Sequence, residues 1–168
     1  MITVRVSTLT DYPRWLELAR EVEPLFGPMA DEPEFCTSLR AAIIEGQAFC
    51  ASGGEGGAFH GGIVISGQAN EILWLAVARQ SRGRGTGAAL MLEALGRLDH
   101  ARPVTVTTFA PAVEAGGPAR RLYESLGFRD SSPAGLNPAG IPTVIMTAFP
   151  PLESDLKRKG RCLSSLKK

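Results

Sequence analysis

The sequence predicts an α/β (α+β) domain in which helices pack against one sheet. Short apolar or alternating segments recur along the chain, segments of helical periodicity separate several of them, and glycines and prolines mark the junctions. The chain has 168 residues, of which 44% are hydrophobic and 21% charged. That balance and length are typical of a globular domain with a core of its own.

The strands are expected where apolar or β-branched residues run between turn signals. In chain order they are predicted at residues 2–6, 47–51, 60–65, 71–78, 104–109 and 143–149. The glycine-rich residues 52–57 indicate a hairpin turn between the second and third strands. Residues 131–142 are rich in proline, glycine and serine and are predicted to form a loop.

The helices are expected where apolar residues recur every three to four positions. They are predicted around residues 15–25, 35–43, 88–98 and 118–126. Thr10 or Asp11 would cap the first helix, and Pro24, Gly27 and Pro28 would break it. Pro118 at a helix start and Gly127 just past the end bracket the last one.

The most informative segment is the loop that follows the 71–78 strand and opens the next helix. It contains, in order, Arg82, Gly83, Arg84, Gly85, Thr86, Gly87 and Ala88. Glycines there let the backbone approach a ligand, and the free N–H groups of a helix start attract an anion. The two arginines add forked donors that suit phosphate. The segment therefore predicts a site for a phosphorylated ligand.

Other interpretations of this loop fit less well. A P-loop of a nucleotide triphosphatase needs a lysine and a hydroxyl residue where Ala88 and Ala89 stand. A dinucleotide-binding fingerprint needs an acidic residue at the end of the next strand, and residues 103–109 contain none. A purely structural turn is the remaining alternative, and the interleaved arginines argue against it.

Two motifs resemble those of a known family. The spacing Arg82-x-x-Gly85-x-Gly87 resembles the coenzyme A pyrophosphate loop of the GCN5-related N-acetyltransferase (GNAT) family, and residues 119–128, with Tyr123, are similar to that family's other signature helix. Gly116 stands where many relatives have asparagine. The resemblance covers residues 2–149 and implies a single mixed, mostly antiparallel sheet flanked by helices. It also implies acetyl-CoA as co-substrate.

The resemblance also implies roles for individual residues. The pantetheine arm of the cofactor would pair with the backbone of Leu75, Ala76 and Val77, whose side chains are expected in the core. The pyrophosphate would bind the N–H groups around Gly83, Gly85, Thr86, Gly87 and Ala88, beside Arg82 and Arg84. Tyr123 would act as general acid towards the leaving thiolate; the alternative is a packing tyrosine.

Glu71 is the candidate general base. The run Glu71-Ile72-x-x-x-Ala76 is similar to the strand that carries the base glutamate in the histone-acetylating members of the family. A solvated glutamate at a strand end is the alternative. His60, in the neighbouring strand, and a water relay are other candidates for the base.

The predicted function is transfer of an acetyl group from acetyl-CoA to a primary amine by direct attack. A protein N-terminal or lysine acetyltransferase and a non-catalytic CoA-binding regulatory module are the alternatives. The acceptor, a small molecule or a protein, would meet the loop after the first helix, which carries Phe26, Met29, Asp31 and Glu32. Those loop acids could equally be solvated.

Composition limits partners and location. The net charge of +1 gives no case for nucleic-acid or membrane binding. The widely spaced Cys36, Cys50 and Cys162 suggest reduced thiols of a cytoplasmic protein, with no metal site. Residues 1–149 are predicted to form the domain and residues 150–168 a solvated basic tail that folding does not need. The choice between monomer and homodimer stays open.

Overall fold

One seven-stranded sheet organises the molecule, in the order β1-β2-β3-β4-β5-β7-β6. The computed structural model describes residues 2–53 and 57–149, so the predicted tail lies outside the described residues. The strands are β1 (Thr3–Val6), β2 (Ala48–Ser52), β3 (Phe59–Ser66), β4 (Glu71–Val77), β5 (Val104–Phe109), β6 (Arg129–Leu136) and β7 (Pro142–Ala148). Neighbours pair antiparallel except β4 and β5, which are parallel. The predicted mixed, mostly antiparallel sheet is confirmed.

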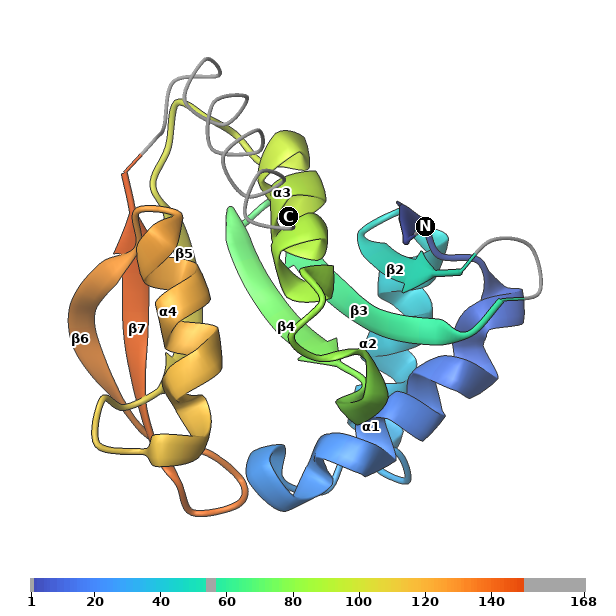
Figure 1. Cartoon of the computed structure of the whole chain (residues 1–168), viewed down its shortest axis with the longest axis horizontal. Coiled ribbons are helices and arrows are strands. Elements are labelled where there is room, and N and C mark those ends of the chain that lie inside the picture. Colours follow the sequence, from blue (N-terminus) through green and yellow to red (C-terminus); the bar gives the residue numbers. More distant parts are fainter. Residues whose placement is uncertain (1, 54–56, 150–168) are drawn as a thin grey trace.

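Helices cover both faces of this sheet (Figure 1). The helices α1 (Tyr12–Phe26) and α2 (Pro33–Ile44) lie behind it in that view, and α3 (Thr86–Arg97) and α4 (Gly117–Ser125) lie in front. Short 3-10 turns are η1 (Leu9–Asp11), η2 (Arg79–Ser81) and η3 (Glu114–Gly116). Among the described residues, no helix is long and apolar enough to cross a membrane.

The two faces of the sheet have separate cores. On the front, Ile72 of β4 and Val106 of β5 pack in one cluster with α3 residues and with Tyr123 of α4. On the back, Trp15 of α1 is fully buried and packs near Trp74 of β4. Burial of this much apolar and aromatic surface is the main source of stability. Both helix pairs are thus held firmly against the central strands.

The sheet divides between its two parallel strands. β4 pairs with β5 only through Glu71 with Thr105 and Ile72 with Val106. The β3 register then shifts at the next step of β4, which leaves Leu73 as an extra residue. A bulge of this kind bends a strand and increases its twist. From there β4 and β5 diverge, as Figure 1 shows, and α3 and α4 flank the divergence on the front.

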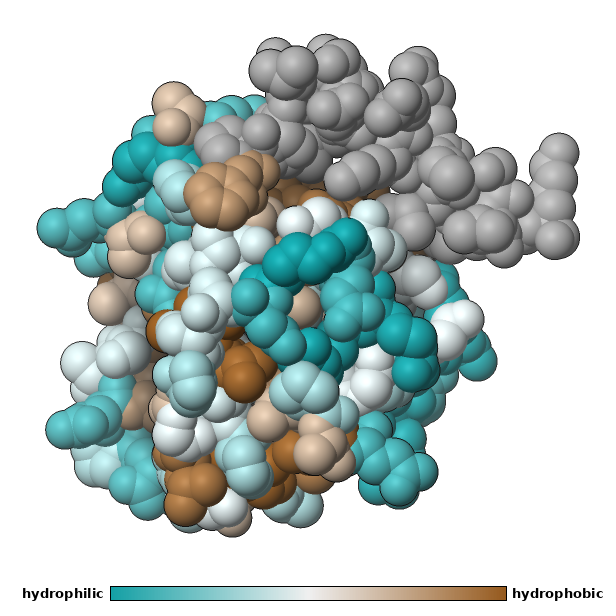
Figure 2. Space-filling view, turned by 90° about the vertical axis from the view of Figure 1, so that its left-hand side faces the viewer, coloured by the Kyte–Doolittle hydropathy of each residue, from teal (hydrophilic) through white to brown (hydrophobic). Residues whose placement is uncertain are grey.

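One local prediction is wrong. The 131–142 segment is not a loop throughout, because β6 extends from Arg129 to Leu136 and pairs with β7. Every residue of β6 is exposed, so it has no buried face to produce an apolar alternation. Pro133 is tolerated because β6 is an edge strand with register shifts. Figure 2, which looks onto this side, shows hydrophobic residues scattered among hydrophilic ones.

Of the three predicted breakers of the first helix, Pro24 lies inside α1, and the helix ends directly before Gly27 and Pro28. The helix continues for two residues past Pro24 to Phe26. A proline there removes a hydrogen bond to the carbonyl of Arg20, an exposed residue whose carbonyl water can reach. The gain is the packing of Phe26 against Phe109 of β5, with ring centroids 5.5 Å apart.

Candidate active site

The glycine-arginine loop joins β4 to the start of α3, as predicted. Gly83 has φ +70° and Gly85, the N-cap of α3, has φ +80°. Residues other than glycine seldom adopt this left-handed conformation. The α3 helix begins at Thr86, two residues before the predicted start. The loop therefore turns sharply into the helix, and its conformation depends on its glycines.

This turn leaves a run of backbone donors free. In the described part of the chain, no backbone N–H of residues 83–88 bonds to a backbone acceptor. The first bond of α3 runs from Ala89 N–H to the carbonyl of Gly85 at 3.0 Å. Consecutive free N–H groups at a helix start form a concave anion site, and the helix dipole reinforces it. The loop can thus hold a pyrophosphate.

Positive charge surrounds these donors. The side chains of Arg79, Arg82 and Arg84 are exposed, and within the described ranges none of them forms an ion pair. Arg82 does make one bond, from its Nε to the carbonyl oxygen of Val77 at 3.1 Å. The charges are therefore available to an anionic ligand on the loop.

A hydrogen-bonded chain fixes the loop from beneath. His60 of β3 bonds through Nδ1 to the Ser81 hydroxyl at 2.7 Å, and the Ser81 carbonyl accepts a bond from the Thr86 hydroxyl at 3.3 Å. Ser81 and Thr86 are both buried. The sequence suggested His60 as a base, but the structure places it against the loop. The sequence alone does not indicate this contact, because it depends on the register in which β3 pairs with β4.

The edge of β4 that faces β5 has free backbone groups beyond Ile72. The bond from Ala78 N–H to the His60 carbonyl fixes which residues of β4 pair with β3. Because bonding alternates along an antiparallel ladder, Ala76 bonds to β3 while Leu75 and Val77 direct N–H and C=O towards β5. The Arg82 bond to the Val77 carbonyl agrees with this orientation. An extended amide-containing chain could pair there.

Comparison with known proteins agrees with this geometry. Residues 29–148 match the family described as acetyltransferase (GNAT) domain. The chain belongs to the GNAT family. It is therefore an N-acetyltransferase whose co-substrate is acetyl-CoA. A search of curated proteins found no match.

Solved structures share the fold. A GNAT-family acetyltransferase from Bacillus cereus superposes with a TM-score of 0.68 at 15% identity, covering 90% of this chain and 99% of that one. The ribosomal-protein-S18-alanine N-acetyltransferase from Escherichia coli gives 0.67 at 18% identity, covering 90% and 96%. The PaiA N-acetyltransferase from Thermoplasma acidophilum, solved with coenzyme A, gives 0.63 at 18%, covering 89% and 99%. At these identities the likeness establishes the fold alone.

Tyr123 lies on α4 within the front core of this GNAT domain. Its ring is buried and packs against Phe128 at a centroid distance of 5.9 Å. Burial raises the pKa of the Tyr123 hydroxyl well above its ordinary value, so the phenol keeps its proton at neutral and moderately basic pH. Among the described residues, the hydroxyl has no hydrogen-bond partner. It is thus a protonated donor that no protein group engages.

The helix that carries Tyr123 comes close to the phosphate loop. A Cβ added at Gly87 would lie 3.2 Å from Leu122 of α4 and 3.6 Å from Val77 of β4. Leu75, Val77 and Leu122 all pack against the front core that contains Tyr123. The start of α3, the end of β4 and α4 therefore meet at one place. The glycine-arginine loop and the helix with Tyr123, which are the two motifs of the sequence, are therefore neighbours in the structure.

Glu71 lies at the opposite end of β4, where the strand still pairs with β5. It alternates with Ile72, whose side chain joins the front core, so Glu71 faces the back of the sheet. Its side chain is half-buried, and burial raises the pKa of its carboxyl above the ordinary value. In the described structure it has no ion-pair or hydrogen-bond partner. Tyr123 and Glu71 thus approach the divergence from opposite faces.

The loop after α1 is held in place by a carboxylate. Glu23 accepts bonds from the backbone N–H groups of Met29 and Ala30, at 3.2 and 2.9 Å. Met29 is buried, whereas Asp31 and Glu32 are exposed. Asp31 pairs with Arg20 at 3.2 Å on the surface. Only Phe26 of the predicted acceptor-loop residues bridges the two halves of the sheet.

That aromatic bridge was missed by sequence reasoning. The Phe26 ring lies 6.4 Å from Trp74 of β4 and 5.5 Å from Phe109 of β5, measured between ring centroids. It therefore spans the divergence on the back of the sheet. Asn137, in the turn between β6 and β7, adds a bond to the Leu25 carbonyl at 2.8 Å. The end of α1 thus joins both halves of the sheet, and a helical pattern alone could not indicate this.

Proposed function

We propose that this enzyme transfers the acetyl group of acetyl-CoA to a primary amine by direct attack. Tyr123 acts as general acid and Glu71 as general base. The observation that carries the proposal is buried Tyr123, whose hydroxyl has no hydrogen-bond partner among the described residues and whose core cluster also packs against Leu75 and Val77 at the end of β4. The pyrophosphate of the co-substrate binds the N–H groups of residues 83–88, with Arg82 and Arg84 supplying charge. The pantetheine arm lies along the free edge of β4.

The edge of β4 refines the expected pantetheine contacts. Leu75 and Val77 supply the backbone groups, because they face β5. The backbone groups of Ala76, which lies between them, bond to β3 and are not free to pair with the pantetheine arm. In this proposal the thioester lies in the divergence of β4 and β5, with α4 on its front side.

The reaction needs one acid and one base. The amine nitrogen attacks the thioester carbonyl, the C–S bond breaks, and the thiolate leaves with the bonding electron pair. The Tyr123 hydroxyl donates its hydrogen bond, and then its proton, to that sulfur on the front side. Glu71 takes a proton from the ammonium form of the acceptor on the back side, directly or through a water. After attack, the nitrogen loses its second proton to water as the amide forms, and Tyr123 and Glu71 return to their starting states by proton exchange with solvent. Acid and base on opposite faces suit a single displacement.

A small-molecule amine is the acceptor that we favour. The aromatic bridge of Phe26 and the bond of Asn137 to α1 close the back of the divergence at its wide end. A compact acceptor needs less open space to reach the thioester than a folded protein surface does. A protein N-terminus or lysine is the second candidate. CoA release, measured with a panel of small amines and with amine-bearing peptides, distinguishes the two.

We expect Glu71→Gln to lower turnover at neutral pH and to have a smaller effect at high pH. An amine acceptor is largely protonated near pH 7, so removing the base costs most there, while at high pH the free amine forms unaided. Because burial raises the pKa of Glu71, the wild-type rate should also fall as the pH drops through that raised value. The measurement is the pH dependence of kcat/KM on the best acceptor.

Glu17→Gln is the matched control, because Glu17 is an exposed glutamate of α1 with no described hydrogen bond. Its pH profile should match that of the wild type. Acetyl-CoA affinity should stay constant in both variants, since the phosphate loop is untouched. Identical pH profiles for Glu71→Gln and wild type would remove Glu71 from the mechanism and leave a water relay or His60 as the base.

A further inference from the structure

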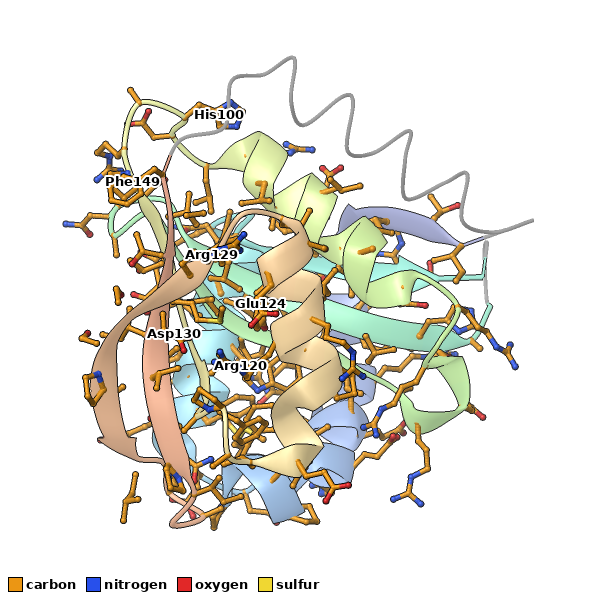
Figure 3. All side chains as sticks on the ribbon, turned by 60° about the vertical axis from the view of Figure 1, so that its left-hand side comes forward. His100, Arg120, Glu124, Arg129, Asp130 and Phe149 are labelled. Carbon is orange, nitrogen blue, oxygen red and sulfur yellow. The ribbon has the colours of Figure 1, made fainter. Side chains whose placement is uncertain are left out.

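Arg120 is a buried cation that the proposed chemistry does not use. It lies on α4, one turn before Tyr123, and only 9% of its surface is exposed. Figure 3 shows its side chain under α4, close to Asp130 of β6 and Glu124 of α4. A buried charge is costly unless it is well paired, so its partners indicate what it does.

The guanidinium group connects α4 to each strand of the smaller half of the sheet. Its Nη2 donates to both carboxylate oxygens of Asp130, at 2.9 and 3.0 Å, and lies 3.5 Å from Glu124. Its Nη1 donates to the carbonyl oxygen of Phe109 at 3.3 Å and lies 3.8 Å from the sulfur of Met146. These partners belong to β6, α4, β5 and β7.

Stability alone is a weak reason for this arrangement. The side chains of Asp130 and Glu124 are 43% and 48% exposed, so both carboxylates keep much of their hydration. Partly solvated ion pairs contribute little to folding. The planar guanidinium group holds its donors in fixed directions, so it fixes the relative orientation of the segments that it joins. A lysine ammonium group, which acts as a point charge, does not. The bonds of Arg120 therefore suit a residue that sets the orientation of α4 relative to β5, β6 and β7.

The contact with Phe109 sets this orientation relative to the active site. Phe109 is the last residue of β5, on the wall of the divergence opposite β4. Its ring packs on Phe26 of α1, and a Cβ added at Gly116, just before α4, would lie 2.6 Å from the Cβ of Phe109. The Arg120 bond and the Gly116 contact together hold the start of α4 against the end of β5.

We propose that Arg120 is a positioning residue that aims the Tyr123 hydroxyl at the thioester sulfur. The hydroxyl has no protein partner in the described structure, so nothing at the tip of the ring holds it. Its place is set by the rotation of α4 and by the Phe128 contact. Arg120 fixes that rotation. This inference rests on the proposed role of Tyr123 as general acid.

The test is a double-mutant cycle with Arg120→Lys in the wild-type and Tyr123→Phe backgrounds. Lysine keeps the charge but loses the fork, so α4 should tilt slightly. A displacement of about 1 Å in a catalytic group can cost roughly 100-fold in rate, and we expect kcat to fall by about 10- to 100-fold. KM for acetyl-CoA should not change. In the Tyr123→Phe background, the same substitution should cost almost nothing, because the group it positions is gone.

Arg121→Lys is the control, since Arg121 is the next residue on the same helix and is exposed. It should leave kcat unchanged in both backgrounds. If Arg120→Lys does not fold, Asp130→Asn carries the same cycle, because it weakens the pair at a half-exposed carboxylate. An equal loss of kcat in both backgrounds, or no loss in either, would overturn the inference. Full turnover of Tyr123→Phe alone would instead overturn the proposed general acid.

Discussion

Replacing Tyr123 by phenylalanine is expected to lower kcat by about 10²- to 10⁴-fold, the usual contribution of general acid catalysis. Tyr123 is buried and its hydroxyl has no hydrogen-bond partner among the described residues, so removal of the hydroxyl disturbs no described hydrogen bond. The phenylalanine ring keeps the contact with Phe128, and the fold should persist. Steady-state kinetics on the best acceptor, with acetyl-CoA binding followed by calorimetry, measures both quantities.

The affinity for acetyl-CoA provides the internal control for this variant. The phosphate loop and the edge of β4 are unchanged in Tyr123→Phe, so the Kd should match that of the wild type. Because burial raises the pKa of Tyr123, the wild-type rate should show no loss of this donor at moderately basic pH. If the variant keeps full turnover while chemistry limits the rate, Tyr123 only packs in the core.

The second large effect is expected for Gly85→Val, which should abolish acetyl-CoA binding while the domain stays folded. Gly85 has φ +80° at the N-cap of α3, a conformation that a β-branched residue adopts only with strain. The loop should rearrange and misdirect its N–H groups. Hydrogen bonds to charged groups contribute about 1.5–3 kcal/mol each, so losing two weakens binding by roughly 100-fold or more.

Gly96→Ala is the matched control, because Gly96 lies in the same helix and a Cβ there would meet nothing within 4 Å. Alanine also favours helix over glycine, so this variant should be at least as stable as the wild type. Calorimetric titration with acetyl-CoA should give micromolar affinity for wild type and Gly96→Ala. A folded Gly85→Val with the same affinity would contradict the assignment of the loop.

The loop and the fold could be predicted because their signals are local. Glycines and arginines between a strand and a helix reflect requirements of backbone conformation and charge at the loop itself, and residues 83–88 lie where they were expected. Apolar alternation likewise located most strands, because those strands have a buried face. The β6 strand was missed because it is exposed along its whole length.

The rest of the candidate site depends on contacts between distant segments. The direction of the Leu75 and Val77 backbone groups follows from the register with β3, which no single strand encodes. The support that His60 gives to the phosphate loop depends on its bond to Ser81, which is 21 residues away in the sequence. The Arg120 contacts join residues of one helix and three strands. In the sequence, Arg120 is one of two adjacent arginines with nothing to mark it as buried.

We expect acetyl-CoA to occupy the divergence of β4 and β5, with its pyrophosphate on the start of α3. A crystal structure with bound CoA tests this most directly. We expect the pyrophosphate oxygens within hydrogen-bonding distance of N–H groups of residues 83–88, the pantetheine amides paired with Leu75 and Val77, and the thiol near the Tyr123 hydroxyl. A pyrophosphate bound elsewhere, or a pantetheine arm that avoids the free edge of β4, would rule out this binding mode.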